Sequence, residues 1–166
     1  MNNKNNSILN TYIFTVFFFG LSLASYLIYR FNNISILGAV LFGILIFLAD
    51  NFSVPLPKTG FVSVNFGISL AALIIFGPAT SIIVTFISSI SIRDILKKEP
   101  YYKHIFNCGQ YLISICVSSW VFEIFFDRSV GNVFIAKNIG LIFMAALIFF
   151  ILNTFLTASV ISLSKK

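Results

Sequence analysis

Apolar runs of about 20 residues recur along this chain from one end to the other. A helix of that length crosses the roughly 30 Å hydrocarbon core of a bilayer. The chain has 166 residues, 58% hydrophobic and 10% charged, and its mean hydropathy is +0.99. A water-soluble core of this size cannot bury all the runs. The sequence therefore predicts an all-α integral membrane protein, a bundle of about six transmembrane helices.

Helix-breaking residues separate the predicted spans. The segment Asn51–Gly60 carries two prolines and a glycine and is expected to be a loop, and Gly77-Pro78 forces a turn between two short helices. The six predicted spans are Thr11–Tyr29, Ile34–Ala49, Phe61–Phe76, Ala79–Leu96, Ile105–Phe126 and Asn138–Ile161. They form one transmembrane domain, 11–161, between a cytoplasmic N-terminal tail, 1–10, and a cytoplasmic C-terminal end, 162–166. Two alternatives stay open: the first run as a signal peptide, and five spans instead of six if the short third run does not cross.

The distribution of basic residues predicts the orientation, because Lys- and Arg-rich loops resist translocation. If the N-terminus is cytoplasmic, the segments on that side hold eight of the eleven Lys and Arg residues, and only Arg30, Arg128 and Lys137 lie outside. Both termini are therefore expected in the cytoplasm. The net charge of +6 needs no nucleic-acid partner, since the basic residues flank apolar segments instead of following one face.

The sequence offers little material for enzyme chemistry or metal binding, with one His and five acidic residues. Cys108 and Cys116 are eight residues apart in one predicted helix, so their backbones are about 12 Å apart, beyond the reach of a disulfide. Neither has the spacing of a zinc knuckle. No Ser-His-Asp set, paired carboxylates, phosphate-binding loop or HExxH motif is found. We expect a protein that is not an enzyme and holds no metal or cofactor.

Polar side chains inside the apolar helices are the candidates for ligand binding, because each costs free energy in lipid. Asn107 and Gln110 are three residues apart and share a helical face. Asn153 lies deep in the sixth span, and Glu123 lies about one turn from the end of the fifth. These four residues are the candidate ligand-binding set. The alternative is that the amides hydrogen-bond between helices and that Glu123 reaches the membrane interface.

Small residues recur four positions apart in several predicted spans, as in Gly20 with Ala24 and Ser81 with Thr85. This spacing lets helix backbones approach closely in a membrane. It predicts helix packing and not a binding site.

Three stretches carry a resemblance to a known group of proteins: Ala49–Pro78, Phe106-Asn-Cys-Gly-Gln110 and Leu152-Asn-Thr154. They resemble the N-terminal membrane region of bacterial HD-GYP and GGDEF signalling proteins from Gram-positive anaerobes, over most of residues 34–161. The resemblance implies a receptor-like module of the bacterial plasma membrane without its cytoplasmic enzyme domains. More weakly, Val62–Asp94 is similar to the S components of energy-coupling factor vitamin transporters, although Ser and Thr replace the glycines expected in the following helix.

The leading hypothesis is a non-enzymatic sensor or anchor module of a signalling protein, with a small-molecule pocket within the helix bundle. Its expected partners are the lipid bilayer, a small-molecule ligand and a cytoplasmic signalling domain reached from Lys165-Lys166. The alternative is an S-component-like, substrate-binding subunit of a vitamin or small-molecule uptake transporter, with an energy-coupling partner. A third class is a structural or assembly protein that binds no small molecule. A fragment of a longer protein is also compatible with the basic end.

Overall fold

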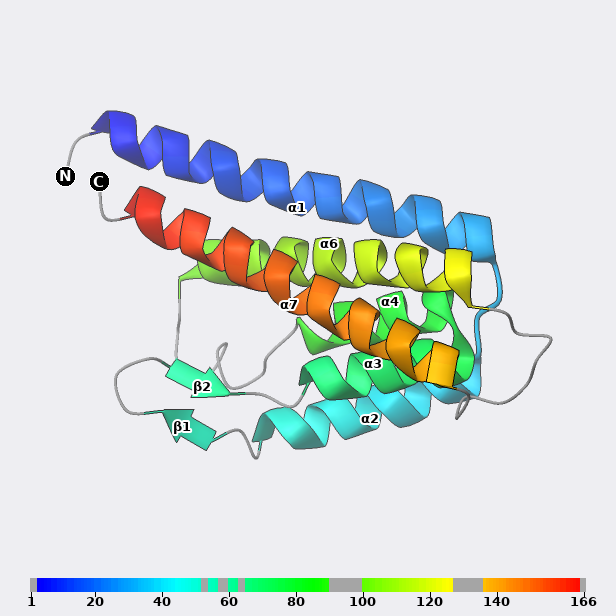
Figure 1. Ribbon diagram of the computed structural model, residues 1–166. Helices are drawn as coiled ribbons and strands as arrows, with labels where there is room; N and C mark the ends of the chain where they lie inside the picture. The colour runs from blue at the N-terminus through cyan, green and yellow to red at the C-terminus, as the bar shows by residue number, and fades with distance from the viewer. Residues whose placement is uncertain are drawn as a thin grey trace.

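Helices dominate the computed structural model, which describes residues 3–51, 54–56, 60–62, 65–89, 100–126 and 136–164. Within these ranges the elements are α1 (Asn3–Phe31), α2 (Ile36–Asn51), β1 (Val54–Leu56), β2 (Gly60–Val62), α3 (Asn65–Phe76), α4 (Pro78–Ser88), α6 (Tyr101–Phe125) and α7 (Ala136–Ser164). Successive helices run in alternating directions (Figure 1). The first turn of α1 and the last turn of α7 therefore lie at the same end of the bundle, here called the terminal end. The opposite end is called the distal end.

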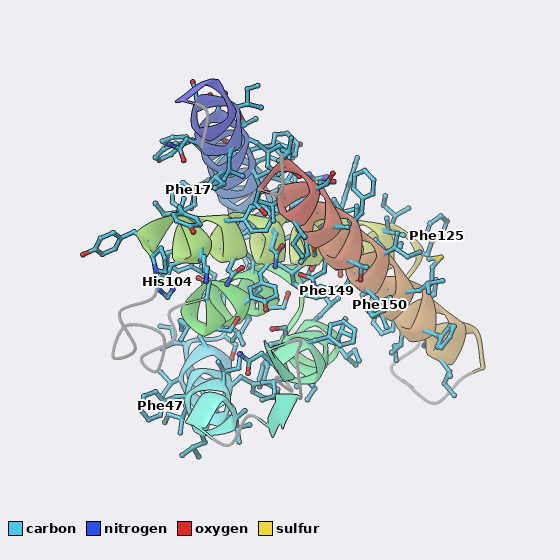
Figure 2. All side chains as sticks on the ribbon, turned by 90° about the vertical axis from the view of Figure 1, so that its left-hand side faces the viewer. Phe17, Phe47, His104, Phe125, Phe149 and Phe150 are labelled. Carbon is cyan, nitrogen blue, oxygen red and sulfur yellow. The ribbon has the colours of Figure 1, made fainter. Side chains whose placement is uncertain are left out.

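Helix α6 lies at the centre of the bundle. It packs against α1 and α7 on one side and against α4 on the other, and α2 and α3 pack against α4 in an outer layer (Figure 2). One cluster of buried apolar side chains joins these layers and includes Leu27, Ile82, Leu112 and Ile115. Helix α6 therefore contacts helices of both layers.

Within the described ranges, three helices are long and apolar enough to cross a membrane, judged by length and composition: α1, α6 and α7. The shorter apolar helices are α2, α3 and α4, with 16, 12 and 11 residues. At a rise of 1.5 Å per residue, α3 and α4 are each only about 16–18 Å long. They form a helical hairpin through Gly77, whose φ of 89° suits glycine, and Pro78 starts α4 in the first-turn position where proline is tolerated.

The outward faces of the bundle are apolar. Phe47, Phe125 and Phe150 point away from it, each at least half exposed, whereas Phe149 points into it and is buried (Figure 2). Continuous exposed apolar faces on this scale are unfavourable in water but suit contact with lipid chains. The surface supports a membrane location.

The structure differs from the sequence-based prediction at several boundaries. Helix α1 begins at Asn3 and not at Thr11, because residues 3–10 contain no proline or glycine to stop it. The third span was predicted to start at Phe61, but Gly60–Val62 pairs with Val54–Leu56 as an antiparallel hairpin, and α3 starts at Asn65. Val54 pairs with Val62 and Leu56 with Gly60, so strand pairing takes the place of helical hydrogen bonds in Gly60–Val62. The predicted fourth span continues to Leu96, and residues 90–96 lie outside the described ranges.

Candidate ligand cavity between α1, α6 and α7

A cavity of about 260 Å³ lies at the terminal end, between α1, α6 and α7. Three helices that are distant in sequence form its walls, which is the usual situation of ligand sites in helix bundles. Its apolar lining residues are Leu9, Ile13, Phe106, Val160 and Ile161, and its polar lining residues are Tyr102, Lys103, Asn107, Thr157 and Ser164.

The positions of the lining residues along their helices divide the cavity into a rim and a floor. Lys103 lies in the first turn of α6 and Ser164 is the last residue of α7, so both belong to the rim. Asn107 is one turn deeper in α6, and Thr157 is two turns deeper in α7. Thr157 and Ser164 are seven positions apart along the helix, which corresponds to a depth of about 10 Å. Asn107 and Thr157 therefore give the floor its polar groups, and most of the other lining residues are apolar.

A hydrogen bond joins α6 to α7 just behind the floor. The Thr157 hydroxyl lies 2.9 Å from Gln110 Oε1 and 2.8 Å from the Asn153 backbone oxygen, so its one proton is shared between two acceptors. Gln110 is only 4% exposed and does not line the cavity. The structure thus places Gln110 in an interhelical contact that supports the floor residue Thr157.

The four sequence-predicted candidates do not form one cluster. Asn107 lines the cavity, and Gln110 lies behind its floor. Asn153 is one turn deeper in α7, and its buried Oδ1 has no hydrogen-bond partner among the described residues. Glu123 is 13 residues from Gln110 along α6, or about 20 Å towards the distal end. The structure brings the three amides to one part of the α6–α7 contact and leaves Glu123 apart.

Positive charge characterises the rim of the cavity. Among the described residues that line it, Lys103 is charged and none is acidic. Across the described ranges, no three His, Cys, Asp or Glu side chains come together as a metal site would require. The described lining thus combines apolar side chains with one cationic side chain and four uncharged polar ones.

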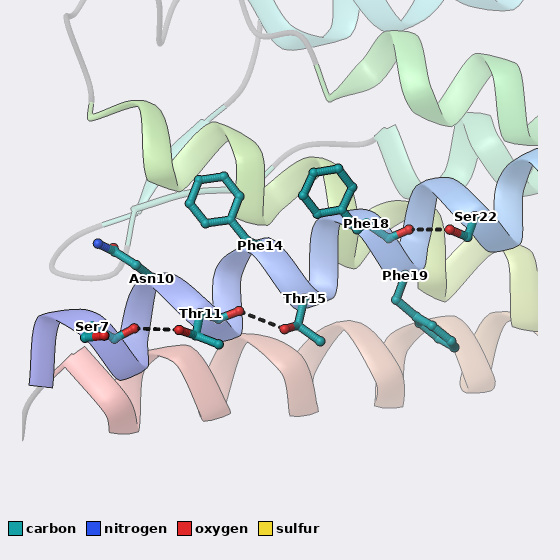
Figure 3. A pocket seen from close by; sticks show the side chains of 8 residues that line it. All are labelled: Ser7, Asn10, Thr11, Phe14, Thr15, Phe18, Phe19 and Ser22. Atoms are coloured by element: carbon teal, nitrogen blue, oxygen red, sulfur yellow. Dashed lines mark hydrogen bonds between the residues drawn. The ribbon is translucent and has the colours of Figure 1, made fainter. Parts of the chain in front are cut away.

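A larger hollow, of about 930 Å³, lies along the outer face of α1 (Figure 3). All its lining residues come from this one helix, so it is an open surface and encloses no ligand. Its hydroxyls bond to their own helix: Thr11 donates to Ser7, Thr15 to Thr11 and Ser22 to Phe18, each to a backbone oxygen. Such local bonds let hydroxyl residues face lipid at low cost.

Several cavity residues were not singled out as site candidates from the sequence. Leu9, Ile13 and Val160 are ordinary apolar residues of amphipathic or apolar helices, and nothing in their spacing distinguishes them. Lys103 was counted only as a topology signal. Its place four residues before Asn107, and hence on the same helical face, is the signal that could have connected it with the site.

Comparison with known proteins agrees with the membrane character of the fold. A protein-family model, MASE9, matches residues 2–166. This family consists of membrane-associated sensor domains. The match takes in all the helices described above and every residue that lines the cavity. No curated protein and no solved structure matches the chain.

Proposed function

Because the chain belongs to the MASE9 family of membrane-associated sensor domains, we propose that it is a non-enzymatic sensing module of the bacterial plasma membrane. It binds a small molecule in the cavity between α1, α6 and α7. The observation that carries this proposal is the position of the cavity, whose walls include the last two turns of α7. A molecule bound there contacts the helix that leads out of the bundle.

The output of the module is a cytoplasmic signalling domain or protein on the C-terminal side. The alternating helices place both described chain ends at the terminal end, and most of the basic residues belong to sequence segments at that end. In this orientation the terminal end faces the cytoplasm. The resemblance to the membrane regions of HD-GYP and GGDEF proteins supports an output of this kind. The shift of α7 on ligand binding is the signal.

Native mass spectrometry of the protein purified from its own host tests the binding step. Val160 packs beside the buried Ile13 and Phe106 in the wall, so Val160→Phe fills part of the cavity. Val40→Phe makes the same change on the exposed face of α2 and is the matched control. We expect a bound small molecule in the wild type and in Val40→Phe, and at least a tenfold loss of occupancy in Val160→Phe.

Two results would contradict the proposal. A wild-type protein without a bound small molecule would mean that the module binds no ligand. Equal occupancy in all three proteins would mean that the ligand binds outside this cavity. Co-purification with an ATPase would instead favour the uptake-component alternative, because a transporter subunit needs an energy-coupling partner and a sensor does not.

A further inference from the structure

We propose that Gln110 couples the cavity to the position of α7 by exchanging one hydrogen-bond partner on α7 for another. This inference rests on the proposed function and assigns a regulatory contact to the same cavity. In the present structure Gln110 is bonded to Thr157 at the cavity floor. In the second arrangement the Gln110 amide turns one helical turn deeper and bonds to the side chain of Asn153.

The two partners lie close together on α7. Thr157 and Asn153 are four positions apart, and therefore on the same face of the helix. The Thr157 hydroxyl is 2.9 Å from Gln110 Oε1 and 2.8 Å from the Asn153 backbone oxygen. The Gln110 amide is thus at most two hydrogen-bond lengths from the Asn153 backbone. The exchange requires a turn of the Gln110 side chain and no slide of a whole helix.

Each arrangement leaves one buried oxygen without a donor. In the present structure this oxygen is Asn153 Oδ1, which is buried and has no partner among the described residues. Gln110 Nε2 is a donor that can satisfy it. When Gln110 turns away from Thr157, its own Oε1 loses its donor, and the Thr157 proton stays on the Asn153 backbone oxygen. Since gain and loss are alike, a small input decides between the two arrangements.

Thr157 connects this exchange to the cavity. It lines the floor, whereas Gln110 and Asn153 are not among the lining residues. A bound molecule whose oxygen or nitrogen accepts the Thr157 proton takes it from Gln110 Oε1, because the hydroxyl has only one proton to give. Gln110 then favours Asn153. The ligand therefore shifts the population between two arrangements that the empty protein already adopts.

The exchange releases the end of α7. It moves the polar contact between α6 and α7 one turn deeper, about 6 Å along the helix. Beyond Thr157, the side chains of Ala158, Ile161 and Ser164 are exposed and hold this part of α7 to no neighbouring helix. An exposed apolar surface stays exposed to lipid when the helix end shifts, so the shift costs little apolar burial. The last two turns of α7 are the part that moves.

Native mass spectrometry and thermal unfolding of Asn153→Leu test the coupling. The present arrangement loses only an unsatisfied oxygen, so the midpoint of unfolding rises. The ligand-favoured arrangement loses its partner, so we expect occupancy by the co-purifying small molecule to fall about tenfold. A structural role outside the cavity lining would not lower occupancy. Asn10→Leu, on the exposed outer face of α1, is the matched control and should change neither quantity.

A double-mutant cycle tests the exchange on protein freed of the co-purifying molecule. Thr157→Val alone should shift the midpoint by less than about 1 °C, because Gln110 turns to Asn153. In the Asn153→Leu background the same change should lower it by about 2–4 °C, as the loss of one ordinary hydrogen bond implies. Thr15→Val removes an exposed hydroxyl that donates to its own helix, and should have the same effect in both backgrounds.

The inference is overturned if Thr157→Val has the same effect in both backgrounds, or if Asn153→Leu keeps the wild-type occupancy. The proposed function survives either result when Val160→Phe still displaces the co-purifying molecule. In that case the cavity senses the molecule without an exchange at Gln110. A wild-type protein without a bound small molecule would contradict the proposed function, and the ligand-driven exchange with it.

Discussion

Hydroxyl side chains are accommodated inside this bundle through bonds to their own helices. Thr85 donates to the Ser81 backbone oxygen at 2.8 Å, and Ser118 donates to the Ser114 backbone oxygen at 2.7 Å. All four residues are essentially inaccessible to solvent. Because the polar groups are satisfied locally, these small residues can pack against neighbouring helices without an unpaired donor. The buried Ser and Thr residues of α4 are thus compatible with packing, as their spacing predicted, and the buried serines of α6 are satisfied in the same way.

Asn153 is an exception to this local satisfaction of buried polar groups. Its replacement tests whether the Asn153 side chain is unsatisfied. Its Oδ1 is buried without a hydrogen-bond partner among the described residues. Burial of an unsatisfied polar atom costs about 1–3 kcal/mol. We therefore expect Asn153→Leu to stabilise the protein by about 1 kcal/mol, measured as a rise in the midpoint of thermal unfolding in detergent.

The control for this change is Asn10→Leu, which replaces an exposed asparagine of α1. It should leave the midpoint nearly unchanged. A lower midpoint for Asn153→Leu would mean that the Asn153 amide makes a stabilising contact, and the assignment of an unsatisfied oxygen would be wrong.

The sequence predicts the polar candidates better than it predicts their arrangement. An amide in an apolar helix stands out by composition, so Asn107, Gln110 and Asn153 could be identified. The burial of Gln110 behind Thr157 depends on the rotation of α6 against α7, which periodicity within one helix does not specify. The place of Glu123 along α6 alone puts it far from the cavity. Glu123 could therefore have been excluded from the candidate set on the sequence alone.

Among the elements, α1 and α6 meet in the closest backbone contact described. A Cβ added to Gly109 would lie 2.6 Å from the Phe17 Cα, and one added to Gly20 would lie 2.7 Å from the Gly109 backbone oxygen. Such separations are shorter than van der Waals contact permits. The crossing therefore requires glycine on both helices, as in close helix pairs of other membrane proteins.

Gly109→Ala should push α1 away from α6 and destabilise the bundle by about 1–3 kcal/mol, the usual cost of overpacking. Gly140→Ala is the matched control, because a Cβ at Gly140 would meet no atom within 4 Å. It should be neutral or slightly stabilising, since alanine favours a helix over glycine by about 1 kcal/mol. Thermal unfolding in detergent compares the two variants, and equal midpoints would contradict the close crossing.

The elements themselves were largely predictable, and their contacts were not. The long apolar runs and the Gly77-Pro78 break identify the helices and the α3–α4 turn. Gly20 was noted as a packing residue, but its partner Gly109 lies 89 positions away in sequence. No local pattern specifies which helix faces which, because every face of an apolar helix is equally compatible with lipid.

At the scale of the whole molecule, helix direction and charge agree. The alternating helices bring the N-terminal end of α1, the C-terminal end of α7 and the start of α6 together at the terminal end (Figure 1). The sequence segments joined to that end contain most of the Lys and Arg residues. Under the positive-inside rule this end, and the cavity rim with it, is the cytoplasmic one in the proposed orientation.

Labelling of single cysteines with a membrane-impermeant maleimide in intact host cells tests this arrangement most directly. The buried Cys108 and Cys116 are first replaced by alanine. We expect Asn33→Cys, in the exposed distal connection after α1, to react in intact cells, and Ser164→Cys, at the terminal end, to react only after lysis. Reaction of both cysteines from the same side, or of Ser164→Cys alone in intact cells, would contradict a membrane-crossing bundle whose cavity opens to the cytoplasm.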